Sequence, residues 1–147
     1  MTENTSRPLL EVKNLSMHFT TKKRGKVSTV KAVDNVSFTI NRGETFGMVG
    51  ESGCGKTVTS LSLIGLLAES ATVQADVLRF DGKDLLSLDR EQRRLVRGSG
   101  ISMIFQEPMT SLNPVFRIGD QVDEVIALHD GENKSKDEVK KRTVELL

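Results

Sequence analysis

The segment GESGCGKT, residues 50–57, constrains the fold of this chain more than any other stretch of its sequence. Its glycines, lysine and threonine match the spacing G-x-x-x-x-G-K-[ST] of a phosphate-binding loop. The apolar run TFGMV precedes the segment, and VTSLSLIGLL follows it with apolar residues near helical spacing. This order of strand, glycine-rich turn and helix is the context that the motif requires, and it predicts an α/β fold of the P-loop type.

The residue types in this segment suit phosphate. Gly50, Gly53 and Gly55 permit positive φ and let the backbone approach a ligand, so that successive N–H groups can turn toward an anion. The helix predicted from Lys56 adds the partial positive charge of its N-terminus. Lys56 can reach the β and γ phosphates, and the Thr57 hydroxyl can ligate Mg²⁺. A glycine-rich turn with a chance lysine is the less favoured alternative. The predicted phosphate-binding residues are Gly50, Glu51, Ser52, Gly53, Cys54, Gly55, Lys56 and Thr57.

The composition is that of a globular chain. With 147 residues the chain has the length of one ordinary domain. A net charge of +1, with 37% hydrophobic and 28% charged residues, argues against a general nucleic-acid binder. The single cysteine, Cys54, cannot form an internal disulfide, which favours a reducing compartment. No apolar run reaches about 18 residues and the start lacks a signal peptide, so we expect neither a membrane span nor export.

The rest of the chain shows alternating patterns of strand and helix. Strand patterns cover residues 9–19, 30–40, 44–50, 71–85 and 101–105. Helix patterns cover residues 56–67, 87–98, 118–129 and 139–147. The first two strands are predicted to pair antiparallel, Asp81 and Gly82 to form a turn, and Ser87 or Asp89 to cap a helix. The basic segment TTKKRGKVST, residues 20–29, is interpreted as a solvated loop in preference to a binding patch.

The whole chain resembles the N-terminal part of an ABC transporter ATP-binding subunit. The resemblance rests on LLEVKNLSMHF, on VKAVDNVSFTINRGETFGMVGESGCGKT and on ISMIFQEPMTSLNP. Within the last segment, MIFQEPMTSLNP looks like the Q-loop of the subfamily that imports oligopeptides, dipeptides and nickel. The resemblance implies that residues 1–147 are an incomplete nucleotide-binding domain. Residues 9–114 are then an antiparallel β-subdomain, the P-loop core and the Q-loop, and residues 115–147 begin the helical subdomain.

The resemblance also implies roles for two residues outside the loop, with ATP and Mg²⁺ as cofactors. It implies that Phe19, near the end of the first strand, stacks on adenine; an ordinary core residue at a strand end is the alternative. It implies that Gln106, after strand 101–105, contacts Mg²⁺ or a bridging water, so that Thr57 and Gln106 are the metal ligands. A neutral amide suits this place because it can move away without leaving a buried charge. A loop-capping amide is the alternative for Gln106.

An importer ATPase at the inner face of the cell membrane is the function that the resemblance implies. Its partners are transmembrane permease subunits and a second ATP-binding subunit, either identical or different. An LSGGQ-like signature, a later strand ending in Asp-Glu and a switch histidine have no match in this sequence. Because hydrolysis requires an oriented water at the γ-phosphate, we expect a truncated chain that binds nucleotide without hydrolysing it.

Two other functions stay open at this stage. One is a small P-loop kinase, and the other is a non-catalytic piece that docks on a transporter. The kinase would need a cluster of arginines over its substrate. The available cluster is Arg90, Arg93, Arg94 and Arg97.

Overall fold

The structure is a computed structural model that describes residues 7–23, 26–105, 111–130 and 134–147. The chain divides into two compact units, Met1–Arg93 and Arg94–Leu147. The elements in chain order are β1 (Leu10–Lys23), β2 (Lys26–Ile40), α1 (Lys56–Ile64), β3 (Ala71–Gln74), β4 (Val77–Phe80), β5 (Lys83–Asp84), α2 (Arg90–Ser99), α3 (Ile118–Asp130) and α4 (Lys136–Leu146). Among the described residues, no helix is long and apolar enough to cross a lipid bilayer.

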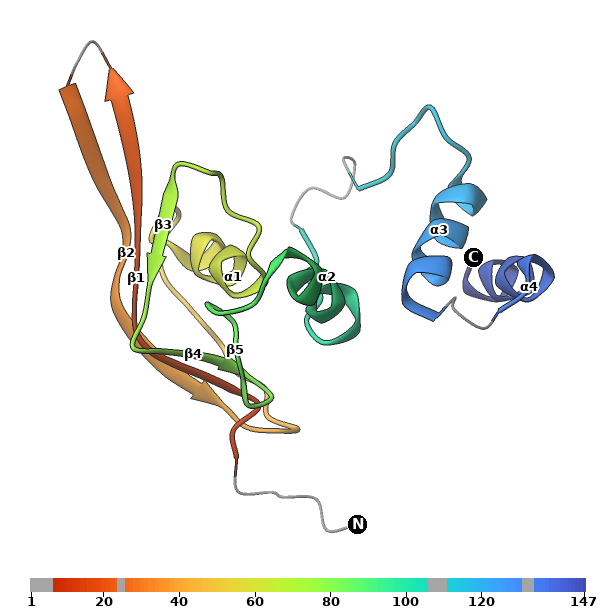
Figure 1. The fold of residues 1–147 in the computed structure, drawn as a ribbon, viewed down its shortest axis with the longest axis horizontal. Helices are drawn as coiled ribbons and strands as arrows, with labels where there is room; N and C mark the ends of the chain where they lie inside the picture. The colour runs from red at the N-terminus through yellow and green to blue at the C-terminus, as the bar shows by residue number, and fades with distance from the viewer. Residues whose placement is uncertain (1–6, 24–25, 106–110, 131–133) are drawn as a thin grey trace. The chain divides into compact units, whose positions relative to one another are not determined.

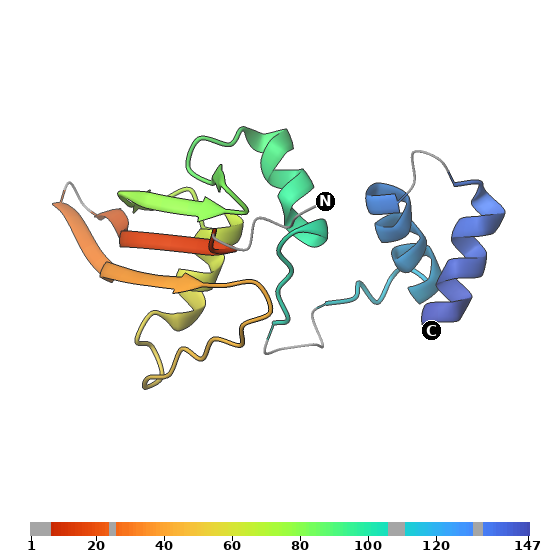
Figure 2. The same cartoon turned by 90° about the horizontal axis from the view of Figure 1, so that it is seen from below.

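An antiparallel five-stranded sheet organises the first unit (Figure 1). The central strand β1 pairs with β2 on one side and with β3 and then β4 on the other, and β5 extends the sheet from β4. Helix α1 covers one face of this sheet (Figure 2). The predicted antiparallel pairing of the first two strands is confirmed, as is the turn at Asp81 and Gly82, where both residues have positive φ.

The core of the first unit depends on a bulge in β1. Val12 and Leu15 are both buried although they stand three positions apart, because Val12 pairs with Phe38 and Leu15 with Val36. One extra residue on β1 therefore reverses the side-chain alternation at this point. Asn14 adopts a φ of 52°, which asparagine tolerates better than most residues.

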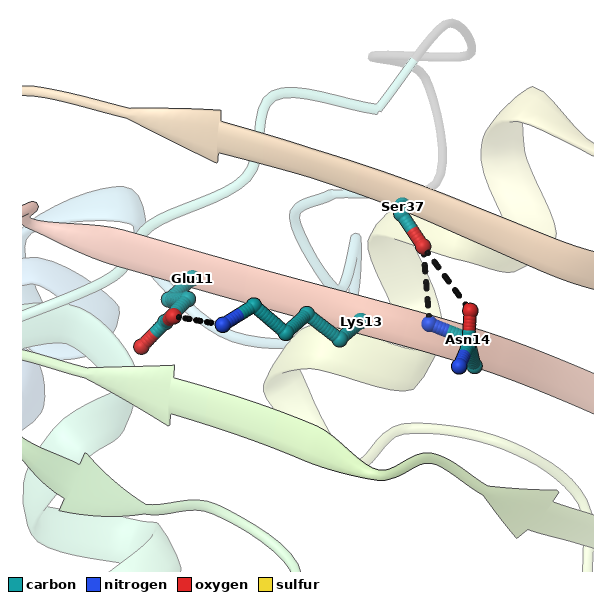
Figure 3. A network of polar contacts seen from close by, with 4 residues as sticks. All are labelled: Glu11, Lys13, Asn14 and Ser37. Carbon is teal, nitrogen blue, oxygen red and sulfur yellow. Dashed lines mark hydrogen bonds and ion pairs between the residues drawn. The ribbon is translucent and has the colours of Figure 1, made fainter.

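Polar contacts hold this bulge in place. The Asn14 backbone N–H donates to Ser37 Oγ at 2.9 Å, and that hydroxyl lies 3.3 Å from Asn14 Oδ1 (Figure 3). Asn14 Nδ2 donates to Asp76 Oδ2 at 2.6 Å, which ties the bulge to the segment before β4. Beside it, Lys13 Nζ forms an ion pair with Glu11 Oε1 at 2.8 Å. Leu15 and Met17 are consequently fixed in the interior, where both are fully buried.

Three predictions about strands and loops are wrong. Residues 44–50 form no strand, and residues 101–105 contribute only an isolated bridge between Ile101 and Arg97. Val49 is 92% exposed and Ile104 is 98% exposed. A strand needs a neighbour for its N–H and C=O groups, and within the described ranges no strand lies alongside either run. Conversely, the described residues of the basic segment 20–29 form strands and not a loop, because β1 continues to Lys23 and β2 starts at Lys26.

The helices agree more closely with the sequence patterns. Helix α1 ends at Ile64, short of residue 67, because Gly65 adopts a left-handed conformation and closes it. Asp89 caps α2: Asp89 Oδ1 accepts from the Gln92 N–H at 2.8 Å, and Gln92 Oε1 accepts from the Asp89 N–H at 3.1 Å. Helix α2 kinks at Arg97, which has a ψ of 131°.

Helices α3 and α4 pack together in the second unit. Ile126 and Val139 are buried, and the Thr143 hydroxyl donates to the Asp123 carboxylate. Helix α4 starts earlier than predicted because Ser135 and Glu138 form a capping box. The backbone N–H and hydroxyl of Ser135 donate to Glu138 Oε2 at 2.7 and 2.8 Å, and these hydrogen bonds hold the pKa of Glu138 below its ordinary value.

Candidate phosphate-binding site

The loop at residues 50–57 connects an extended segment to α1. Gly53 has a φ of 80° and Gly55 a φ of 92°, so two of the three predicted glycines use a conformation that other residues avoid. Gly50 does not have positive φ, but the space around its Cα leaves little room for a side chain. A Cβ on Gly50 would stand 2.6 Å from Cys54 Sγ, so the two ends of the loop approach closely. The loop is therefore folded tightly on itself.

Gly55 joins the loop to the sheet. It is the N-cap residue of α1, and a Cβ on it would lie 2.5 Å from the backbone oxygen of Ala32 in β2. The Gly55 carbonyl accepts hydrogen bonds from the Thr59 N–H at 2.8 Å and from the Thr59 hydroxyl at 2.9 Å. Thr59 is itself buried. Position 55 is consequently restricted to glycine both by its φ and by the neighbouring strand.

Lys56 folds back across the loop. Its Nζ donates to the carbonyl oxygens of Gly50 and Glu51, each at 2.8 Å, and lies 3.3 Å from Cys54 Sγ. The ammonium group is thus held by the loop itself, on the side where the chain enters the motif. Only two of the eight residues in this segment carry a charge, Glu51 and Lys56. Lys56 is therefore the cation that the loop can offer to an anion.

The N-terminus of α1 has unused hydrogen-bond donors. It has no side-chain cap and no acidic residue in its first turn. Within the part of the chain that the structure describes, the backbone N–H groups of Ser52, Gly53, Gly55, Lys56 and Thr57 make no hydrogen bond. The Thr57 side chain is equally unpaired there, and the residue is exposed. Such a set of donors at the positive end of a helix dipole fits a phosphate group.

A stacked aromatic pair supports the segment that leads into the loop. The rings of Phe38 in β2 and Phe46 have centroids 5.1 Å apart and an interplanar angle of 13°. Phe46 thus rests on the sheet although residues 44–50 form no strand. The sequence placed both phenylalanines in strand patterns, but nothing in the order of residues indicated that they touch. The contact of Gly55 with Ala32 was missed for the same reason.

The other residues that the sequence assigned to a site are Phe19, Gln106 and the arginine cluster of the kinase alternative, and each has a different outcome. Phe19 is half-buried in β1, opposite Val30 and Ala71, and the strand continues to Lys23, so Phe19 is farther from the strand end than predicted. Gln106 lies outside the described residues. In the arginine cluster considered for a kinase, Arg93 makes a local structural contact, because its Nε donates to the Leu88 carbonyl at 3.0 Å. Among the described residues, no three acidic, histidine or cysteine side chains form a metal-binding group.

Comparison with known proteins decides the family. The family model described as ABC transporter matches residues 33–146, which include the whole loop and α1. This chain belongs to the ABC transporter family. The membership confirms the α/β P-loop class that the sequence predicted, and the antiparallel sheet with its helices is consistent with an incomplete domain of that class.

Several curated proteins of this family are similar to the chain. The dipeptide transport ATP-binding protein DppD of Haemophilus influenzae is 45% identical over 95% of this chain and 40% of its own length. The oligopeptide transport ATP-binding protein AppD of Bacillus subtilis is 47% identical over 95% of this chain and 41% of its own length. The peptidoglycan transport ATP-binding protein YejF of Agrobacterium fabrum is 45% identical over 100% of this chain and 26% of its own length. The chain thus spans about two fifths or less of the length of these ABC family relatives.

Proposed function

We propose that this chain binds ATP through the loop at residues 50–57. The observation that carries the proposal is the N-terminus of α1, with its unpaired N–H groups, no capping side chain and no acidic residue in the first turn. Phosphate oxygens accept hydrogen bonds from such groups, and the helix dipole favours their negative charge. Lys56 supplies the cation for the β and γ phosphates once it leaves the carbonyls of Gly50 and Glu51.

Mg²⁺ is the second cofactor of the proposal, with Thr57 and Gln106 as its ligands. Hydroxyl and amide oxygens are hard ligands of the kind that Mg²⁺ binds. The unpaired Thr57 hydroxyl supports this assignment, whereas the assignment of Gln106 rests on its position in the sequence after residues 101–105. When bound, Mg²⁺ neutralises charge on the β and γ phosphates.

The proposal extends to the protein of which such a domain is a part. That protein is the ATP-binding subunit of an importer of dipeptides, oligopeptides or a related solute, at the inner face of the cell membrane. It works with permease subunits and with a second ATP-binding subunit. The names of the relatives support this, because they describe ATP-binding proteins of dipeptide and oligopeptide transport. Residues 9–114 are assigned to the β-subdomain, P-loop core and Q-loop, and residues 115–147 to the start of the helical subdomain.

A calorimetric titration with three ligands tests the nucleotide proposal. MgATP and inorganic triphosphate should both bind, whereas adenosine, which lacks phosphates, should not. Phe19→Ala should weaken MgATP about fivefold, since an aromatic contact contributes about 1 kcal/mol, and should leave triphosphate unchanged. Binding of adenosine as tightly as MgATP would contradict the assignment of the loop. Equal loss of both phosphate ligands in the Phe19 variant would contradict adenine stacking and leave the loop assignment standing.

A second test concerns turnover. We expect the chain of 147 residues to release no phosphate from ATP above background, because its sequence holds no carboxylate in an Asp-Glu strand motif after the loop. The measurement is steady-state phosphate release by the purified chain. Activity that disappears in Lys56→Ala belongs to this chain rather than to a contaminant. Such activity would contradict the expectation and favour the small-kinase alternative.

A further inference from the structure

Arg93, near the start of α2, links the C-terminal end of α1 to the segment that leads into α2. The residue is half-buried. Its Nε donates to the Leu88 carbonyl at 3.0 Å, and its Nη2 donates to the Leu86 carbonyl at 3.4 Å. A Cβ placed on Gly65 would stand 2.9 Å from Arg93 Nη1 and 3.5 Å from Arg93 Cδ. The guanidinium group therefore lies directly against the residue that ends α1, and all four residues belong to the first unit.

Gly65 leaves the space that this guanidinium occupies. Its φ of 64° and ψ of 35° are left-handed, and its N–H donates back to the Ser62 carbonyl at 3.3 Å. The last turn of α1 contains no basic residue of its own. Arg93 consequently supplies, from outside the helix, the positive charge that the negative end of a helix dipole favours.

The segment that holds Arg93 is itself fixed to the sheet. Leu85 is buried, and its N–H donates to the carbonyl of Leu78 in β4 at 2.8 Å. The Leu86 N–H donates to Asp84 Oδ1 at 3.0 Å. Arg93 thus connects the end of α1 to a segment that cannot shift without disturbing the pairing with β4.

Helix α1 depends on contacts at both of its ends. It has nine residues, fewer than the roughly 12 to 15 that an isolated helix needs in water. At its N-terminal end, Gly55 lies close to the backbone of Ala32 in β2. At its C-terminal end, the corresponding contact is that of Gly65 with Arg93. A displaced C-terminal end would tilt the helix and move the N–H groups at its opposite end.

We propose that Arg93 is a positioning residue of the phosphate-binding loop. By holding the C-terminal end of α1 against residues 86–88, it keeps the N–H groups at the N-terminus of α1 directed at the phosphates. Arg93 does not touch the ligand, because the two ends of a nine-residue helix are about 13 Å apart. This inference rests on the proposed nucleotide function and adds to it a residue outside the loop.

Calorimetric titration with MgATP and with inorganic triphosphate tests the role of Arg93. Arg93→Gln should weaken both ligands about fivefold, the size of a partly buried interaction between a charge and a helix end. The two losses should be equal, because Arg93 acts on the phosphate site and not on adenine. Arg90→Gln is the matched control, since it removes the same charge from an exposed position of α2 and should leave both affinities unchanged.

Gly65→Ala tests the same contact from its other side. The added Cβ displaces the Arg93 guanidinium, so this variant should also weaken both ligands about fivefold. The double variant should lose no more than either single variant, because both substitutions remove one contact. Gly82→Ala is the control for backbone strain. Gly82 has a φ of 78° and a Cβ there meets nothing within 4 Å, so stability should fall while affinity stays unchanged.

These titrations separate the role of Arg93 from the nucleotide proposal. Circular dichroism confirms that each variant is folded under the conditions of the titration. The role of Arg93 is overturned if Arg93→Gln binds both ligands like the original chain, if Arg90→Gln loses as much, or if only MgATP is weakened. It is also overturned if the losses of Arg93→Gln and Gly65→Ala multiply in the double variant. Failure of the original chain to bind either ligand would instead overturn the proposed function, and this inference with it.

Discussion

Replacing Lys56 by alanine is expected to weaken the binding of MgATP by about 10- to 150-fold. This range corresponds to the 1.5 to 3 kcal/mol typical of a hydrogen bond to a charged group, roughly. The reason is that Lys56 is the only basic residue in residues 50–57, and its ammonium is already held at the loop by Gly50 and Glu51. Calorimetric titration of the original chain and the variant measures the change.

Lys31→Ala is the matched control for this prediction. Lys31 is an exposed lysine of the same unit that lies in β2, outside residues 50–57. It forms an ion pair with Asp34. Its removal lowers the net charge equally, so MgATP affinity should stay within about twofold of the original, as expected for a screened surface charge. Equal affinity of the Lys56 variant and the original chain would show that the phosphates bind elsewhere.

Gly55→Ala is expected to reduce the free energy of unfolding of the first unit by about 2 to 4 kcal/mol. A left-handed conformation costs an alanine about 1 to 2 kcal/mol. The added Cβ would also stand 2.5 Å from the backbone oxygen of Ala32, which cannot move without displacing β2. Urea unfolding followed by circular dichroism, without nucleotide, measures the loss.

Gly53→Ala separates the two causes. Gly53 has a φ of 80°, close to the 92° of Gly55, and belongs to the same loop, but a Cβ there meets nothing within 4 Å. This variant should therefore show only the conformational cost of about 1 to 2 kcal/mol. If both variants lose the same stability, the contact between position 55 and β2 contributes nothing, and the account of why the loop is anchored there is wrong.

Elements set by local sequence were predictable. The sequence predicted a helix from Lys56, a turn at Asp81 and Gly82 and a cap at Asp89, and the structure has all three, although α1 ends at Ile64 rather than at residue 67. Each of these depends on residues a few positions apart, whose conformational preferences are readable from the chain. The positive φ of Gly53 and Gly55 in residues 50–57 is local in the same way, because it follows from the spacing of the glycines.

Features that depend on distant neighbours were not predictable. The runs at 44–50 and 101–105 have the composition of buried strands, but composition does not say whether a neighbouring strand is present. The charge of segment 20–29 predicts a loop, whereas residues 20–23 of β1 pair with residues 26–29 of β2. The requirement for glycine at position 55 has a similar origin, because Ala32 is remote in sequence and close in space.

The position of Lys56 has a thermodynamic consequence for any ligand of the loop. Its ammonium can meet a phosphate oxygen only after leaving the carbonyls of Gly50 and Glu51, so one set of charge-assisted bonds is exchanged for another. The heat released on binding is therefore a difference between two similar quantities rather than the full strength of the new bonds. We therefore expect a polyphosphate to be preferred over a single phosphate mainly because it reaches more backbone N–H groups of the loop at once.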